Sequence, residues 1–182
     1  MAKGGNYERE FARQLSLWYT WGTDDSVFWR VNASGGRARV RAKSGKRTDN
    51  QYGDICAVKA MGNALTDRTV WELKRGYHSW SPFDVIDKAA HRKATVFETF
   101  WSQVIQAQAD AGGDRIPMLV FRRDQRVSCI AFPYNQRHYF RQGGTMPAPP
   151  GAMLAVSREL VVLIVRVENF FAWADPGMWI HQ

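Results

Sequence analysis

Hydrophobic positions recur with two different periods along this chain. Near the N-terminus, Tyr7, Phe11, Leu15 and Trp18 follow one another at spacings of four, four and three residues. This spacing predicts a helix over residues 6–20 with a single apolar stripe. Further helical patterns cover 82–92 and 95–111, and short apolar runs of strand length cover 26–31, 54–58, 69–74, 117–121, 127–132 and 160–167. The order of helix, strands, helices, strands predicts an α/β fold, with helices flanking a central mixed β-sheet.

Two of the predicted strands carry charged side chains inside apolar runs. Asp54 opens the run 54–58, and Glu72 and Lys74 interrupt the run 69–74. Alternate residues of a strand share a face, so Glu72 and Lys74 should point the same way, with their backbone positions roughly 7 Å apart along the strand. Trp71 and Leu73 then take the other face, which suits a core. The two runs therefore predict two carboxylates and an ammonium on one side of the sheet.

The first helix offers a third carboxylate. At about 100° per residue, Glu8 lies beside the apolar stripe, whereas Glu10 lies farther round the helix. Glu8 is therefore the acid at the margin of the core that can reach a site on the sheet. Alternatively, Glu8 and Glu10 only favour the N-terminus of the helix electrostatically.

Three carboxylates that approach one another in a partly dry cleft repel, which raises their pKa values. A divalent cation reverses this effect and holds the carboxylates ionised. Oxygen ligands suit a hard ion, so Glu8, Asp54 and Glu72 predict a site for Mg²⁺, with Mn²⁺ as a substitute. Lys74 would position the attacking water or offset charge on a phosphate in the transition state. The competing interpretation is a surface ion pair, since Glu-x-Lys is common on exposed strands.

Net charge changes the choice between these interpretations. The chain carries +8 at pH 7, which favours a polyanionic partner, nucleic acid before an anionic membrane surface. Six of the 25 basic residues cluster in one glycine-containing loop, 34–51: Arg37, Arg39, Arg41, Lys43, Lys46 and Arg47. A solvated hairpin without a partner is the alternative for this loop.

Composition adds few further constraints. The 45% apolar and 23% charged content is that of an ordinary globular protein, and no run is long enough for a transmembrane helix. With no signal-peptide pattern at the N-terminus, we expect a cytoplasmic protein of a bacterial, archaeal or phage-infected cell. Cys56 and Cys129 are expected to be buried free thiols.

Several other segments carry notable chemistry. Residues 122–126 form a charged hairpin turn, and residues 141–151 form a loop rich in glycine and proline. Trp80, beside the predicted site, would either stack on unpaired bases or pack in the core. Phe170, Phe171, Trp173 and Trp179 form an aromatic C-terminal end expected to pack on the body or on a second subunit.

With these motifs in hand, the chain resembles the archaeal-type Holliday-junction resolvases of the PD-(D/E)XK, or restriction-endonuclease-like, superfamily. Lys3-Gly4-Gly5-Asn6-Tyr7-Glu8-Arg9-Glu10 is similar to their Lys-Gly-x-x-x-Glu-Arg-Glu opening, in which the first Glu joins the metal site. Arg30 through Ser34-Gly35, Asp54-Ile55-Cys56-Ala57 and Glu72-Leu73-Lys74 match three further motifs in the same order. The resemblance covers roughly residues 3–132.

The resemblance implies metal-dependent hydrolysis of DNA phosphodiester bonds by a homodimer acting on branched DNA. Glu8, Asp54 and Glu72 would bind metal, and Lys74 would assist. Arg9, Arg30 and the basic residues of 34–51 would hold phosphates, with Ser34 nearby. The sequence departs from the family pattern at Gly53, where the superfamily name has proline, and in its longer, more basic segment 34–54.

We therefore predict a nuclease core over residues 1–135 with a basic loop at 34–51. Residues 133–182 have no counterpart in the resemblance, and residues 136–182 would form a C-terminal β and aromatic extension packed on the core within the same domain. The predicted function is a Mg²⁺-dependent endonuclease (a hydrolase of DNA recombination) acting on branched DNA. Two alternatives stay open: a nuclease of the same fold that acts on duplex, nicked or single-stranded DNA, and a DNA-binding module without catalysis.

Overall fold

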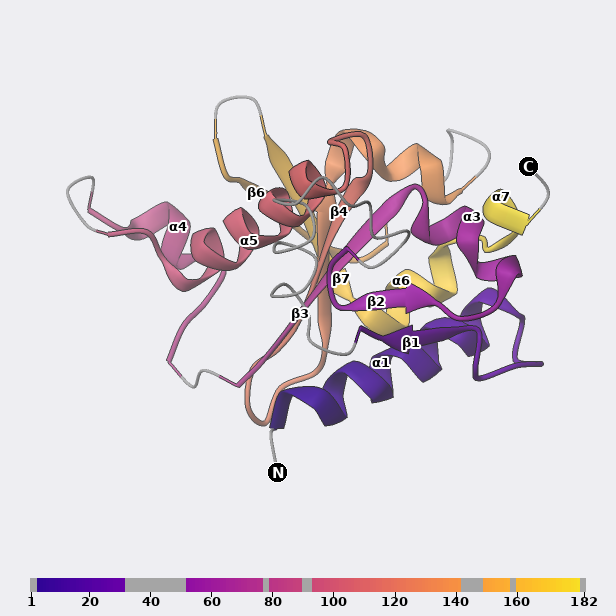
Figure 1. The fold of residues 1–182 in the computed structure, drawn as a ribbon. Helices are drawn as coiled ribbons and strands as arrows, with labels where there is room; N and C mark the ends of the chain where they lie inside the picture. Colours follow the sequence, from indigo (N-terminus) through magenta and orange to yellow (C-terminus); the bar gives the residue numbers. More distant parts are fainter. Residues whose placement is uncertain are drawn as a thin grey trace, which may run out of the picture.

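A five-stranded sheet lies at the centre of the fold (Figure 1). The structure, a computed structural model, describes residues 3–31, 52–76, 79–89, 93–141, 149–157 and 160–180. The strand order is β3-β4-β5-β7-β6, with β3 at Thr69–Arg75, β4 at Ile116–Arg122, β5 at Cys129–Pro133, β6 at Gly151–Ala155 and β7 at Val161–Arg166. Strands β3 and β4 are parallel and the other neighbours are antiparallel, so the sheet is mixed, as predicted.

Helices cover both faces of this sheet because its central strands are apolar on both sides. Helix α1 (Lys3–Tyr19) packs on one face together with α6 (Val167–Trp173) and α7 (Gly177–Ile180), and α5 (Val96–Asp110) packs on the other. Along β3, Trp71 and Leu73 enter the core under α1, whereas Val70 enters the core under α5. The alternation predicted for this strand is confirmed.

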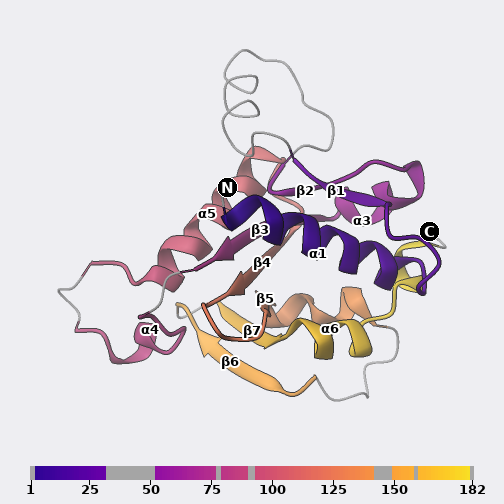
Figure 2. The same cartoon turned by 90° about the horizontal axis from the view of Figure 1, so that it is seen from below.

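A short antiparallel hairpin extends the α1 face beyond the edge of the sheet. Strand β1 (Phe28–Arg30) pairs with β2 (Ile55–Ala57), and Figure 2 shows both strands beside α1. Gly53, just before β2, forms an isolated parallel bridge with Trp71 in β3. This bridge places the start of β2 against the edge strand of the main sheet.

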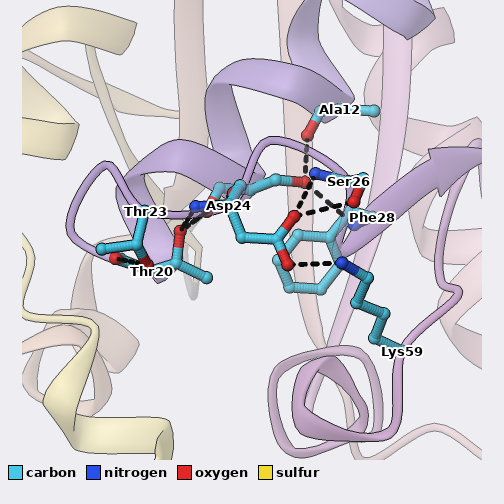
Figure 3. A network of polar contacts seen from close by, with 8 residues as sticks. Ala12, Thr20, Thr23, Asp24, Ser26, Phe28 and Lys59 are labelled. Atoms are coloured by element: carbon cyan, nitrogen blue, oxygen red, sulfur yellow. Dashed lines mark hydrogen bonds and ion pairs between the residues drawn. The ribbon is translucent and has the colours of Figure 1, made fainter.

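The turn between α1 and β1 is fixed by a polar network (Figure 3). Asp24 accepts hydrogen bonds from the backbone N–H and the hydroxyl of Ser26, and its carboxylate pairs with Lys59. These partners lower the pKa of Asp24 to about 2, the Lys59 hydrogen bond being the largest cause. The buried Ser16 hydroxyl donates to the Ala12 carbonyl and accepts from the Phe28 backbone N–H. The network therefore holds the start of β1 against α1.

The remaining elements show where the predicted boundaries fail. Helix α1 begins at Lys3, ahead of the predicted start, and within the described residues the segment 82–92 is helical only in α4 (Asp84–Asp87), because Lys88 is extended. Helix α5 matches its prediction, with Thr95 and Glu98 forming a capping box. The others are the 3-10 helices η1 (Ala60–Gly62) and η2 (Tyr134–Phe140), and α3 (Asn63–Thr66). No helix in the described part of the chain is long and apolar enough to span a membrane.

The aromatic C-terminal end packs on the body of the protein, which was one of the two expected arrangements. Phe170 is fully buried and its ring contacts those of Phe132 and Phe140. Phe171 stacks on Phe11 and Trp18 of α1. Residues beyond 150 thus supply two strands of the sheet and part of the core under α1.

Candidate functional site

Asp54 lies at the junction between the small hairpin and the main sheet. Its backbone N–H donates to the Trp71 carbonyl at 2.7 Å, and its own carbonyl accepts from Val31 at 2.9 Å. The residue is 5% exposed, and its Oδ2 accepts a hydrogen bond from the backbone N–H of Leu73 at 2.8 Å. The carboxylate is therefore held by main-chain groups and has little freedom to turn away.

Gly53 explains how the chain approaches β3 so closely. It adopts φ +75°, and a Cβ at this position would collide with the Trp71 carbonyl. Only glycine combines that backbone conformation with that contact. Glycine is thus required at position 53, where the superfamily name has proline, because the chain passes so close to β3.

Glu72 and Lys74 share one face of β3, as predicted. Lys74 Nζ and Glu72 Oε1 lie 2.6 Å apart, with side-chain exposures of 19% and 16%. The Lys74 ammonium also lies over the Phe100 ring of α5, 5.7 Å from its centre. The pair is thus half-buried under α5, so the interpretation as an ordinary solvated ion pair does not describe it.

Glu8 reaches the same region from α1. Tyr7, Phe11 and Leu15 are buried, which orients the helix and leaves Glu8 at the margin of the core. Glu8 Oε2 lies 3.4 Å from Arg30 Nη1, and the side chain of Glu8 is 18% exposed.

Electrostatics show that these side chains act on one another. The pKa of Asp54 is raised to about 7, chiefly because burial disfavours the charged carboxylate and then because Glu72 adds negative charge. The Leu73 hydrogen bond and the Lys74 charge oppose this rise, and Glu8 adds to it. The charges of Glu72, Lys74 and Glu8, the other three residues predicted to form the centre, thus all act on Asp54.

The donor set has the chemistry of a hard-cation site, but its oxygens do not converge as a metal cluster. Within the described ranges, no group of three or more His, Cys, Asp or Glu side chains lies close enough to hold an ion. Glu8 and Glu72 are instead drawn to Arg30 and Lys74. The three carboxylates and the raised pKa of Asp54 fit a divalent cation that would compete with these two ion pairs.

The predicted DNA-binding residues divide into two groups. Arg9 is exposed and bonds within its own helix, to the Gly5 carbonyl and the Asn6 side chain. Arg30 is half-buried beside Glu8. The others lie outside the described residues: Ser34, Arg37, Arg39, Arg41, Lys43, Lys46 and Arg47.

Three further sequence interpretations are decided by the fold. Trp80 is buried against Phe100 and Phe121, so the interpretation as a base-stacking residue is wrong and the packing one is confirmed. Cys56 and Cys129 are free thiols, as predicted, but they are half-buried rather than buried. Burial still raises the pKa of both thiols.

Sequence reasoning missed two partners of the site. The Leu73 N–H that anchors Asp54 is a backbone group, which no side-chain pattern reveals. Glu10, which was not among the ligands predicted from the sequence, forms a two-pronged ion pair with Arg122 at 2.9 and 3.0 Å. The position of Glu10 on the helix, on a different side from Glu8, could have indicated that it contacts another part of the fold, which is Arg122 of β4.

The chain matches a known protein family. A family model described as "Phage putative PDDEXK endonuclease" matches residues 1–149. The match and the mixed sheet flanked by helices confirm the predicted PD-(D/E)XK superfamily and restriction-endonuclease-like fold class. Neither the curated proteins nor the solved structures yielded a match.

Proposed function

Because the chain belongs to the family of phage PDDEXK endonucleases, we propose that it hydrolyses DNA phosphodiester bonds with Mg²⁺ held by Glu8, Asp54 and Glu72. One observation carries this proposal: the pKa of the buried carboxylate of Asp54 is shifted by the charges of Glu72, Lys74 and Glu8. Buried like charges destabilise a fold unless a ligand offsets them, and Mg²⁺ or Mn²⁺ is the ligand that oxygen donors prefer.

The residues of the chain have distinct roles in this proposal. A divalent ion would lower the pKa of a water and neutralise charge on the phosphate. Asp54, fixed by the Leu73 N–H, gives the site a rigid anchor on the edge of β3. Lys74 presents its ammonium on the same face as Glu72, where it would stabilise the negative charge that develops on the phosphate oxygens. Phe100 keeps bulk water from one side of that ammonium.

Asp54→Asn tests the chemistry directly. The amide keeps the size of the side chain and removes its charge, so we expect cleavage of DNA in Mg²⁺ to fall by on the order of a thousand-fold or more. DNA binding, measured by fluorescence anisotropy in EDTA, should persist. Asp67→Asn, at an exposed position, is the matched control and should cleave normally.

Full cleavage by Asp54→Asn would overturn the proposal. Calorimetry separates it from a binding module without catalysis, because the wild type should bind Mg²⁺ or Mn²⁺ at millimolar concentration and Asp54→Asn should bind it more weakly. Wild-type protein that binds DNA and neither ion would favour the module.

The resemblance of residues 3–10 to junction resolvases supports a finer proposal, a homodimer that cuts branched DNA. A two-fold dimer would place two such centres on two strands of a junction. We expect a four-way junction to be cleaved faster than a flap or a plain duplex of the same arm sequence, each assayed under single-turnover conditions. Equal rates on all three substrates would be consistent with a nuclease but would contradict a preference for branched DNA.

A further inference from the structure

A cluster of arginines surrounds a hollow at the turn between β4 and β5. The hollow has a volume of about 310 Å³. It is lined by Arg75, Arg122, Arg123, Asp124, Gln125 and Arg126, which we call the arginine hollow. Four arginines and one acidic residue therefore line it.

The pairing of two of these arginines is unfavourable. Arg75 ends β3 and lies directly opposite Arg122 in the parallel register of β3 and β4. Like charges at paired positions of a sheet destabilise it. Glu10 offsets the charge of Arg122, whereas no described residue forms an ion pair with Arg75.

Two arginines of the hollow have unused hydrogen-bonding capacity. Arg122 donates to Glu10, and Arg123 donates to the Trp80 carbonyl. Arg75 and Arg126 are exposed, and within the described part of the chain their guanidinium groups make no hydrogen bond or ion pair. An arrangement that costs stability and leaves donors free is typical of a binding site for an anion.

The arginine hollow lies at the same end of β3 as the candidate centre. Arg75 directly follows Lys74, and side chains alternate along a strand, so Arg75 points to the α1 face. Arg122 confirms that face, because its guanidinium lies over the Tyr7 ring of α1, 4.6 Å from its centre. Tyr7 and Glu10 of α1 thus contact Arg122, which lines the hollow, and Glu8 between them in the sequence belongs to the centre.

We propose that the arginine hollow binds a backbone phosphate of DNA next to the phosphate that is cleaved. The DNA partner rests on the proposed function, whereas the affinity for an oxyanion rests on the arginines alone. Guanidinium forks match phosphate oxygens in pairs, and the net charge of +8 favours a polyanion.

A pair of charge-matched double variants tests this proposal. Arg75→Gln with Arg126→Gln removes the two free arginines of the hollow. Arg13→Gln with Arg68→Gln removes the same charge elsewhere, since Arg13 pairs with Asp25 at the surface and Arg68 is exposed at the opposite end of β3. Duplex binding is measured by anisotropy in EDTA from low to moderate salt, with and without a 5′-phosphate on the DNA.

We expect the slope of log affinity against log salt to become less steep by about 1.8 in the hollow variant, for two lost phosphate contacts. The control variant should keep the wild-type slope, and Arg75→Gln should not lower the thermal midpoint, because it relieves the pairing with Arg122. Equal slopes in both double variants would overturn the hollow as a DNA site and leave the proposed nuclease untouched.

Two other outcomes are equally decisive. A change of slope seen only with 5′-phosphorylated DNA would assign the hollow to a terminal phosphate and overturn the backbone assignment. Wild-type protein that neither binds nor cleaves DNA would overturn the proposed function itself. If the wild type then binds an acidic peptide and the hollow variant binds it more weakly, the arginines would be assigned to a protein partner.

Discussion

Without metal, the free energy of unfolding of this protein should fall as the pH rises from about 4 to about 7, and Asp54→Asn should abolish that fall. The cause is the pKa of Asp54, which is raised from 3.8 to about 7 by burial and by the negative charge of Glu72. Between these values the native state keeps a proton that the unfolded chain has released. The native state is therefore favoured at low pH, and this stabilisation is lost as the pH rises through about 7.

The size of the effect follows from the shift. One pKa unit corresponds to about 1.4 kcal/mol, so the rise from 3.8 to about 7 implies a loss of up to about 4 kcal/mol at pH 8. Total stabilities of single domains are about 5–15 kcal/mol, so this loss is a large part of the whole. The side-chain amide of the Asp54→Asn variant carries no charge and can still accept the Leu73 N–H, so the variant escapes the penalty. Asp54→Asn should thus be more stable than the wild type at pH 8 by roughly 2–4 kcal/mol.

Urea denaturation in EDTA at pH 4, 6 and 8 measures this effect. Asp67→Asn removes an exposed carboxylate and should retain the wild-type fall, so it controls for general acid effects. Asp24 acts in the opposite direction and in a lower window, because its pKa is lowered to about 2. A wild type whose stability is flat between pH 4 and 8 would contradict the buried, carboxylate-facing position of Asp54.

The features of the site that could be predicted from sequence are those set by local periodicity. Two-residue alternation placed Glu72 and Lys74 on one face and Trp71 and Leu73 on the other, because that alternation is a property of any strand. The turn angle of the helix separated Glu8 from Glu10, and the structure bears this out: Glu8 acts on Asp54, whereas Glu10 pairs with Arg122.

The features that could not be predicted depend on contacts between distant segments. Trp80 is buried because α5 and β4 place Phe100 and Phe121 against it, and no local pattern carries that information. The arginine hollow exists because β3 and β4 pair in a register that aligns Arg75 with Arg122, which are 47 positions apart in the chain. The contribution of residues 151–155 to the sheet also depends on pairing with β7 rather than on their own sequence.

Phe170→Ala should destabilise the protein by about 3–5 kcal/mol, the usual cost of deleting a fully buried phenylalanine ring. Phe170 is 0% exposed in α6, and its ring contacts those of Trp18, Phe132 and Phe140. Helix α6 lies beyond the segment matched by the family, which ends at residue 149. The variant therefore measures how far the C-terminal segment supports the core that positions Glu8.

The matched control is Phe83→Ala, which deletes the same ring where it is 55% exposed and should change stability by less than about 0.5 kcal/mol. A single cooperative transition, shifted in Phe170→Ala, would support the prediction that residues 136–182 fold with the nuclease core. Two transitions, with only the weaker one affected, would contradict it. Loss of α6 packing also frees Phe171 from Phe11 and Trp18, so α1 and Glu8 would lose their support. Nuclease activity in Phe170→Ala should therefore decline at temperatures below the unfolding midpoint, whereas Phe83→Ala should keep the wild-type temperature dependence.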